Sequence, residues 1–216
     1  MPRFAANLTM MFNEVPFLDR FEAAAKAGFT AVEFLFPYDH PAEEVGKRLH
    51  GNGLTQALFN LPPGNWEAGE KGFAALPERF ADLQQSLRTA LPYAKATGVK
   101  RVHLMAGIAD RSDRRAVEAF YKSVAWAAEF FAPHGLDVVI EPINPRNVPG
   151  YFLNDFNFAR DLIVQETGWR FLQEAGITLI AADSPDAFVD EIDPGGLGRQ
   201  CGGGPVGRCM RSSPIE

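Results

Sequence analysis

The stretch "GLDVVIEPIN", residues 135–144, places consecutive Val and Ile residues directly before a single carboxylate. Such a continuous apolar run, without alternation, predicts a strand buried on both faces, as in a parallel sheet covered by helices. Glu141 then lies at the carboxyl end of that strand. A carboxylate inside the core costs several kcal/mol unless it is paired, whereas the carboxyl edge of a parallel sheet is where α/β proteins hold their chemistry. We therefore predict that Glu141 faces a substrate, a metal or solvent.

Further strand-like runs alternate with helical segments along the chain. The additional runs are "RFAANLTMMF" (3–12), "TAVEFLFPY" (30–38), "LTQALFNLP" (54–62) and "KRVHLMAG" (100–107). Amphipathic helices are expected between them, over 15–29, 76–98 and 112–135, with Pro92 kinking or dividing the second. Strands and helices in series predict an α/β fold, either a (β/α)8 barrel or an open doubly wound sheet. Because neither Gly-rich nucleotide-binding motif is present, we favour the barrel, here incomplete with five or six β/α units.

Composition excludes several classes of protein. The chain has 216 residues, 46% of them hydrophobic, which is enough for one sizeable core. A formal charge of −6 and the absence of a basic stripe argue against nucleic acid or an anionic membrane as partner. No apolar run is long enough to cross a bilayer and no signal-peptide layout opens the chain, so a cytoplasmic location is expected. Both cysteines fall within 201–216, so no disulfide framework is expected in the body of the chain.

One loop differs from the others in composition. Residues 60–73, "NLPPGNWEAGEKGF", follow the carboxyl end of a predicted strand and are rich in Gly and Pro. The loop carries Asn60, Trp66, Glu70 and Lys71, which we predict to bind substrate as the loop reaches over a pocket. The alternative is a loop held by its own hydrogen bonds.

Four stretches together carry a family resemblance. "RFAANLTMMF", "GFTAVEFLFPYD", "FNLPPGNWEAGEKGFAALPER" and "VVIEPINPRNVPGYFL" resemble hydroxypyruvate isomerase and its relatives, including 2-oxo-tetronate isomerases, within the xylose-isomerase-like barrels. The resemblance runs in register over about residues 1–157. It implies an aldose-ketose type isomerisation, such as hydroxypyruvate to tartronate semialdehyde, or the equivalent step on a related small hydroxy-oxo acid.

The resemblance also implies roles for individual residues. Glu141 matches a glutamate that serves as acid/base catalyst and as ligand to a divalent metal ion, Mg²⁺ or Mn²⁺. An enediol mechanism needs both a base and stabilisation of the developing oxyanion, which a carboxylate and a metal can supply. The second catalytic glutamate and the remaining metal ligands, expected on later strands, have no match in the sequence. Asp183, after a further strand-like stretch, could replace the missing metal aspartate.

Two other residues on predicted strands have alternative roles. His103 is predicted either to face the barrel mouth and bind substrate or to lie in the core. Asn7 is predicted either to contact substrate or to make a structural hydrogen bond. Glu33 is either a pocket acid or a buried partner for Lys or Arg.

The remainder of the chain departs from the isomerase pattern. Residues 158–190 resemble part of the catalytic domain of serine recombinases, without the nucleophilic serine or DNA-binding region of that family. Residues 194–216 are Gly- and Arg-rich, and we expect a disordered tail that is either a frameshift product or an ordinary flexible segment. The predicted organisation is thus a partial barrel (1–157), a recombinase-like helix and strand (158–193) and the tail.

Three functional hypotheses follow from these features. The first is an isomerase acting on a small hydroxy or oxo acid, for which a homo-oligomer that covers an open sheet edge is one predicted assembly. The second is a truncated, chimeric remnant without catalysis. The third, a DNA-recombinase fragment, conflicts with the acidic charge and the missing nucleophile.

Overall fold

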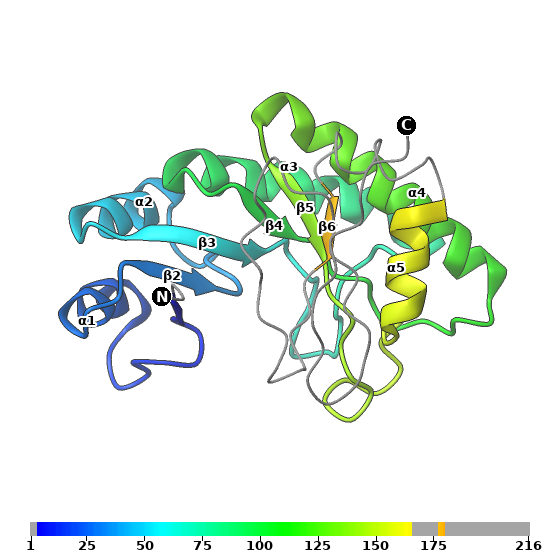
Figure 1. The fold of residues 1–216 in the computed structure, drawn as a ribbon, viewed down its shortest axis with the longest axis horizontal. Coiled ribbons are helices and arrows are strands. Elements are labelled where there is room, and N and C mark those ends of the chain that lie inside the picture. The colour runs from blue at the N-terminus through cyan, green and yellow to red at the C-terminus, as the bar shows by residue number, and fades with distance from the viewer. Residues whose placement is uncertain (1–3, 166–176, 180–216) are drawn as a thin grey trace, which may run out of the picture. The chain divides into compact units, whose positions relative to one another are not determined.

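The computed structural model describes residues 4–165 and 177–179, and within them a parallel β-sheet is flanked by helices (Figure 1). The strands are β1 (Ala5–Asn7), β2 (Ala31–Phe34), β3 (Thr55–Asn60), β4 (Arg101–His103), β5 (Asp137–Ile140) and β6 (Ile177–Leu179). They are hydrogen-bonded in the order β1-β2-β3-β4-β5-β6, and each neighbouring pair is parallel. A doubly wound sheet reverses its strand order at a switch point, so this sequential order confirms the predicted barrel-type α/β fold.

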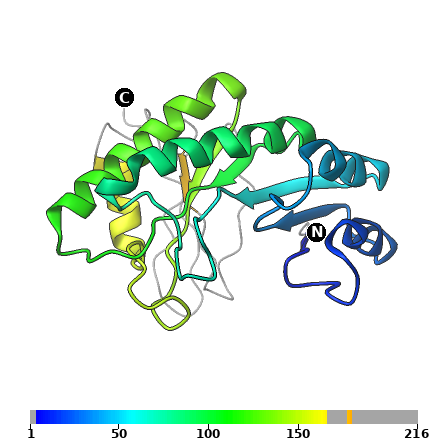
Figure 2. The same cartoon turned by 180° about the vertical axis from the view of Figure 1, so that it is seen from behind.

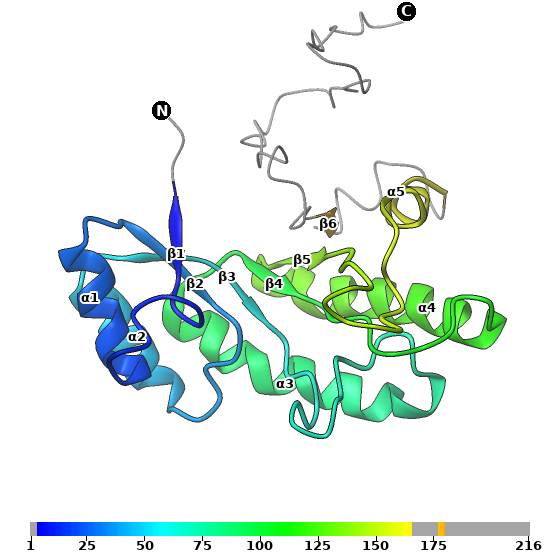
Figure 3. The same ribbon diagram turned by 90° about the horizontal axis from the view of Figure 1, so that it is seen from below.

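Helices cover the sheet in the way the β/α alternation predicts. They are α1 (Arg20–Lys26), α2 (Ala42–Gly51), α3 (Phe80–Thr97), α4 (Arg114–Phe131) and α5 (Phe156–Gln165), with short 3-10 turns at Phe17–Asp19, Pro77–Arg79 and Ala132–His134. Figures 2 and 3 show α3 and α4 running side by side along one face of the sheet. Among the described residues, no helix combines the length and the apolar character needed to cross a membrane.

The buried faces explain why these segments form the core. Val138, Val139 and Ile140 of β5 are all fully buried, which confirms the reading of the apolar run before Glu141. Phe59 of β3 and Phe120 of α4 are also buried, in one continuous apolar cluster. Burying side chains of this size stabilises the fold by about 1.5–3 kcal/mol each.

The strands are shorter than the apolar runs that predicted them. The run over 3–12 forms a strand only at Ala5–Asn7, because the amides of Met10 and Met11 both donate to the Asn7 carbonyl and turn the chain. The apolar residues after each strand belong to loops at the carboxyl edge. Of the two predicted effects of Pro92 on the helix over 76–98, a kink or a division, division was wrong, since α3 continues through Pro92 to Thr97, and Gly98 ends the helix with φ +72°.

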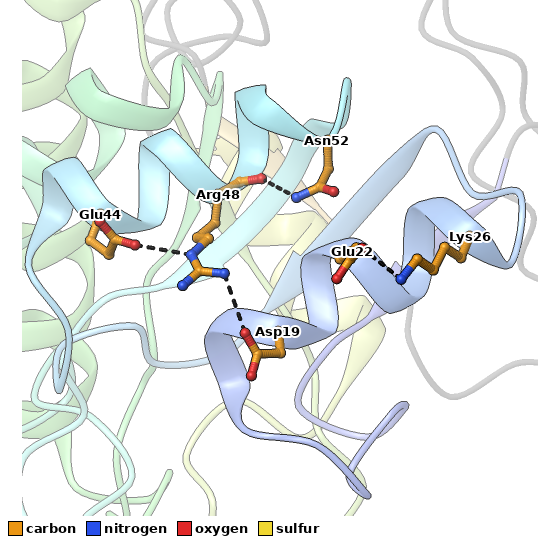
Figure 4. Close-up of polar contacts among 6 residues, drawn as sticks. All are labelled: Asp19, Glu22, Lys26, Glu44, Arg48 and Asn52. Carbon is orange, nitrogen blue, oxygen red and sulfur yellow. Dashed lines mark hydrogen bonds and ion pairs between the residues drawn. The ribbon is translucent and has the colours of Figure 1, made fainter.

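Ion pairs join α1 and α2 on the surface (Figure 4). Arg48 of α2 donates to Glu44 on its own helix (2.9 Å) and to Asp19 at the start of α1 (3.2 Å). Asn52 then donates to the Arg48 carbonyl (2.8 Å) just after the end of α2. Because these groups are partly exposed, the pairs fix orientation more than they add stability.

Candidate active site

Glu141 directly follows β5, so its side chain lies at the carboxyl edge of the sheet as predicted. The side chain is 21% exposed, neither buried in the core nor free in solvent. A half-exposed carboxylate at this position can exchange protons with a bound molecule while remaining held by the protein.

His103 is the last residue of β4 and lies beside Glu141. Its register partner on β5 is Val139, and its Nδ1 is 3.8 Å from the Glu141 Oε2. The residue is 1% exposed, and neither ring nitrogen has a hydrogen-bond partner among the described residues. Burial lowers the pKa of His103 to about 4, so the imidazole is neutral at neutral pH. The ring is therefore buried, as the core alternative predicted, and it lies beside the Glu141 carboxylate, while substrate binding by His103 stays a prediction.

Tyr151 belongs to the same group, although sequence reasoning assigned it no role. Its hydroxyl oxygen accepts a hydrogen bond from the Ala106 amide (2.8 Å), and Tyr151 pairs with Ile108 in a short antiparallel bridge. Burial, and to a lesser degree the charge of Glu141, raises the pKa of Tyr151, while the Ala106 hydrogen bond opposes that rise. Tyr151 therefore links the loop after β5 to the segment after β4. Its hydroxyl is near enough to Glu141 for the carboxylate charge to affect its pKa. In the sequence, the tyrosine of "PGYFL" (149–153) is the one feature that could have pointed to this role.

Asn60, at the end of β3, is brought next to His103 by strand register. Its Nδ2 lies 3.8 Å from the Met105 Sδ in a long hydrogen bond, and its carbonyl accepts from the Tyr38 hydroxyl at 2.6 Å. Asn60 is buried, so its amide is held against the segment that follows β4.

Asn7 and Glu33 form a second polar pair, at the ends of β1 and β2. Asn7 Nδ2 donates to Glu33 Oε1 (2.9 Å), while its Oδ1 accepts from the Thr9 amide (3.0 Å). Burial raises the pKa of Glu33, and the Asn7 hydrogen bond partly offsets the rise. No Lys or Arg in the described part of the chain forms an ion pair with Glu33, so the structure does not show the basic partner that was one alternative.

The loop after β3 carries the three remaining predicted site residues. Trp66 is 42% exposed and packs on Phe36 with ring centroids 5.1 Å apart. Lys71 lies over the Trp66 ring, 3.3 Å from its centroid, and donates to the Trp66 carbonyl (3.1 Å). Glu70 bonds within the loop and to Arg79. The structure thus shows the hydrogen bonds within the loop that the alternative to substrate binding predicted. Trp66 nevertheless lies exposed on the surface of the loop.

The residues that the structure describes do not complete a metal site. They include no group of three or more His, Cys, Asp and Glu side chains placed to hold one ion. Glu141 supplies a carboxylate of the kind that Mg²⁺ and Mn²⁺ prefer, and His103 is its nearest candidate ligand. Asp183 lies outside the described residues.

The sequentially ordered parallel sheet, with Glu141, His103 and Asn60 at its carboxyl edge, has the architecture of a (β/α) barrel. The chain belongs to the xylose isomerase-like TIM barrel family, whose family model matches residues 21–178.

Relatives within this family share high sequence identity. The chain is 57% identical over 156 residues to 2-oxo-tetronate isomerase from Cupriavidus necator, covering 71% of this chain and 60% of the relative. It is 39% identical over 165 residues to hydroxypyruvate isomerase from Escherichia coli, covering 76% and 64%. Among solved structures, that of an "AP endonuclease, family 2" from Brucella melitensis is 46% identical with a TM-score of 0.76, covering 83% of this chain and 67% of that one.

The chain spans about three-fifths of the length of the first curated relatives it matches. The family match continues to residue 178, past the boundary at 157 predicted from sequence. The structure, in turn, places β6 parallel to β5, where a sixth β/α unit belongs. The comparisons give no support to the predicted resemblance between residues 158–190 and serine recombinases.

Proposed function

We propose that the chain is an isomerase of small hydroxy-oxo acids, interconverting hydroxypyruvate and tartronate semialdehyde or carrying out the equivalent step on 2-oxo-tetronate. The relatives named for these two activities support the substrate class. The observation that carries the proposal is the Glu141 carboxylate at the end of β5, with the neutral His103 ring 3.8 Å away. A cytoplasmic location and a homo-oligomeric state remain predictions.

The chemistry moves one proton from a carbon to the adjacent carbon and, by way of the enediolate, one proton from the hydroxyl oxygen of the first carbon to the carbonyl oxygen of the second. Glu141 removes the proton from the carbon next to the carbonyl, and the electron pair forms an enediolate. The same carboxyl group then returns the proton to the neighbouring carbon, so one acid/base residue serves both half-reactions. His103, being neutral, carries one ring N–H that donates to Glu141 or to the enediolate oxygen after a small rotation. Hydrogen bonds of this kind often tighten only when substrate binds.

A divalent cation, Mg²⁺ or Mn²⁺, forms the second part of the proposal. When bound, such an ion would stabilise the negative charge on the enediolate oxygen. Glu141 is the described residue that would supply a ligand oxygen, and Asp183 is the proposed further ligand. Cation binding is independent of the proposed acid/base role of Glu141, and a separate experiment tests it.

Solvent exchange tests the proton transfer directly. In D2O, the purified chain should incorporate deuterium at the hydroxymethyl carbon of hydroxypyruvate, followed by proton NMR. Glu141→Gln should reduce this rate by about 100-fold or more, the usual contribution of a general base. Asp137→Asn is the matched control, because Asp137 lies at the opposite, amino end of the same strand.

Comparing wild type, Glu141→Gln and Asp137→Asn also removes a trivial explanation of the activity. A contaminating isomerase from the expression host would act equally in all three preparations. The proposal would be contradicted if deuterium exchange persisted in Glu141→Gln. It would also be contradicted if the wild-type chain exchanged neither hydroxypyruvate nor 2-oxo-tetronate. Absence on both substrates would favour the non-catalytic alternative.

A further inference from the structure

Glu70 occupies the centre of the loop after β3, and both of its carboxylate oxygens are engaged. Oε2 accepts a hydrogen bond from the Asn65 amide (2.5 Å), and Oε1 accepts from the Arg79 guanidinium (2.5 Å). The Glu70 amide in turn donates to the Asn65 carbonyl (3.0 Å). These contacts, led by the Arg79 hydrogen bond, lower the pKa of Glu70, so the carboxylate stays ionised. Each oxygen thus accepts a hydrogen bond from within the protein.

Arg79 anchors the loop to the start of α3. Its Nε donates to Asp82 in the first turn of the helix (2.5 Å), while its Nη1 bonds Glu70. Its guanidinium also lies over the Phe73 ring, 4.7 Å from the centroid. The planar Arg79 guanidinium thus contacts Asp82 of α3 and both Glu70 and Phe73 of the loop. The single ammonium group of a lysine cannot make this set of contacts.

The backbone leaves room for the Glu70 carboxylate. A Cβ on Gly64 would fall 2.1 Å from the Glu70 Oε2 and 2.8 Å from the Phe73 ring, so a larger residue at this position would displace the Glu70 carboxylate. Gly64 also has φ +91°, which other residues rarely adopt. The loop therefore folds around the carboxylate in one specific conformation.

These contacts hold residues next to the exposed Trp66 and the partly exposed Lys71. Asn65, the hydrogen-bond partner of Glu70, directly precedes Trp66, and Glu70 directly precedes Lys71. Lys71 in turn lies on the Trp66 ring. At the far end, Gly72 bridges Ala106 on the segment that follows His103, so the loop is attached to the carboxyl edge of β4 (Figures 1 and 2).

We infer that Glu70 is a positioning residue of the proposed active site: together with Arg79 it clamps the loop so that Trp66 and Lys71 are presented at the carboxyl edge of the sheet. The inference rests on the proposed function for its effect on substrate binding. It replaces direct substrate contact as the role of Glu70 and leaves Trp66 and Lys71 as the substrate-facing pair.

The clamp can be tested without any catalysis. The chain contains three tryptophans, so 5-fluorotryptophan labelling gives three fluorine NMR signals, of which Trp66→Phe identifies that of Trp66. In Glu70→Gln the Trp66 signal should shift toward the solvent-exposed position and become more sensitive to a soluble paramagnetic quencher. Trp126, packed against Phe80 and Phe130, serves as internal reference. Glu67→Gln is the matched control, because Glu67 is exposed in the same loop and bonds to no described residue.

A second variant guards against simple misfolding. Arg79→Lys keeps the charge but loses the fork, and it should reproduce the change at Trp66 while the thermal transition stays cooperative. A Trp66 signal that is the same in Glu70→Gln, Arg79→Lys and wild type would overturn the clamp.

Kinetics then test whether the clamp serves the site. For hydroxypyruvate or 2-oxo-tetronate, Glu70→Gln should raise KM several-fold with a smaller change in kcat, since Glu70 touches no reacting atom. A changed Trp66 signal with unchanged KM would overturn the positioning role. If the wild-type chain shows no turnover, the proposed function fails, and the fluorine spectra still decide whether the clamp exists.

Discussion

His103 shows how a single residue can be costly to the fold and useful to the site. Its ring is buried, and both of its nitrogens lack hydrogen bonds among the described residues. An unsatisfied buried polar group costs about 1–3 kcal/mol. We expect His103→Leu to raise the free energy of unfolding by about 1 kcal/mol in urea denaturation while strongly reducing solvent exchange on substrate. That combination would mark His103 as retained for function.

Gln56 provides a control for this prediction. Its Oε1 is the other buried side-chain atom without a partner in the described part of the chain, and it lies toward the amino end of β3. Gln56→Met should change stability modestly and leave exchange intact. A His103→Leu variant that loses more than about 2 kcal/mol, the range of damaged core packing, would instead assign the ring a structural role.

The same residues show what the sequence could reveal. Glu141 was located because consecutive Val and Ile residues fix a buried strand and therefore its end. Tyr151 was not, because its role depends on which two loops meet, and the bond from the Ala106 amide joins residues 45 positions apart. The hydrogen-bond partners of Glu70 and Lys71 depend on the loop conformation, which composition does not determine. The sequence therefore could not decide between a substrate-binding loop and a loop held by its own hydrogen bonds.

At the scale of elements, the loop after β3 depends on close backbone contact with the segment after β4. A Cβ on Gly72 would lie 2.3 Å from the Met105 carbonyl oxygen, and Gly72 has φ +106°. Gly69 in the same loop has a similar φ of +91° but open space around its Cβ position. Substituting Gly69 therefore measures the free-energy cost of the positive φ alone, and substituting Gly72 measures that cost together with the cost of the close contact.

We expect Gly69→Ala to destabilise the chain by about 1–2 kcal/mol, the cost of a left-handed conformation for a residue with a Cβ. Gly72→Ala should cost clearly more and should also disturb the Trp66 signal, because the loop must move away from β4. Urea denaturation of the two variants side by side measures the difference. Equal destabilisation would mean that the loop relaxes freely around Met105 and that the contact does not hold it.

The order of elements was easier to predict than their ends. Apolar periodicity fixed the alternation of strands and helices, and the family match and sheet order confirm the resulting barrel type. The ends were missed where a local interaction competes with the pattern. Asn7 accepts two backbone amides and stops β1 early, while α3 tolerates Pro92 because packing against α2 and α4 outweighs one missing hydrogen bond.

At the scale of the whole molecule, the chain shares the barrel of its relatives over about three-fifths of their length. The described residues supply one carboxylate and one imidazole at the candidate site, and Asp183 lies beyond them. Whether the chain binds a divalent cation is therefore a property of the full 216 residues and is best measured on the intact protein.

Thermal unfolding provides that measurement. A ligand that binds only the native state stabilises it by about 2.7 kcal/mol at a hundredfold excess over its Kd, which raises Tm by several degrees. We expect Mn²⁺ or Mg²⁺ to raise the Tm of the wild-type chain and of Asp137→Asn, but not that of Glu141→Gln, and EDTA to reverse the rise. Equal shifts in all three proteins would indicate binding elsewhere, and no shift in any would remove the cation from the proposal. In that case exchange in D2O still decides whether Glu141 acts as a base, because proton transfer by a carboxylate does not require the metal.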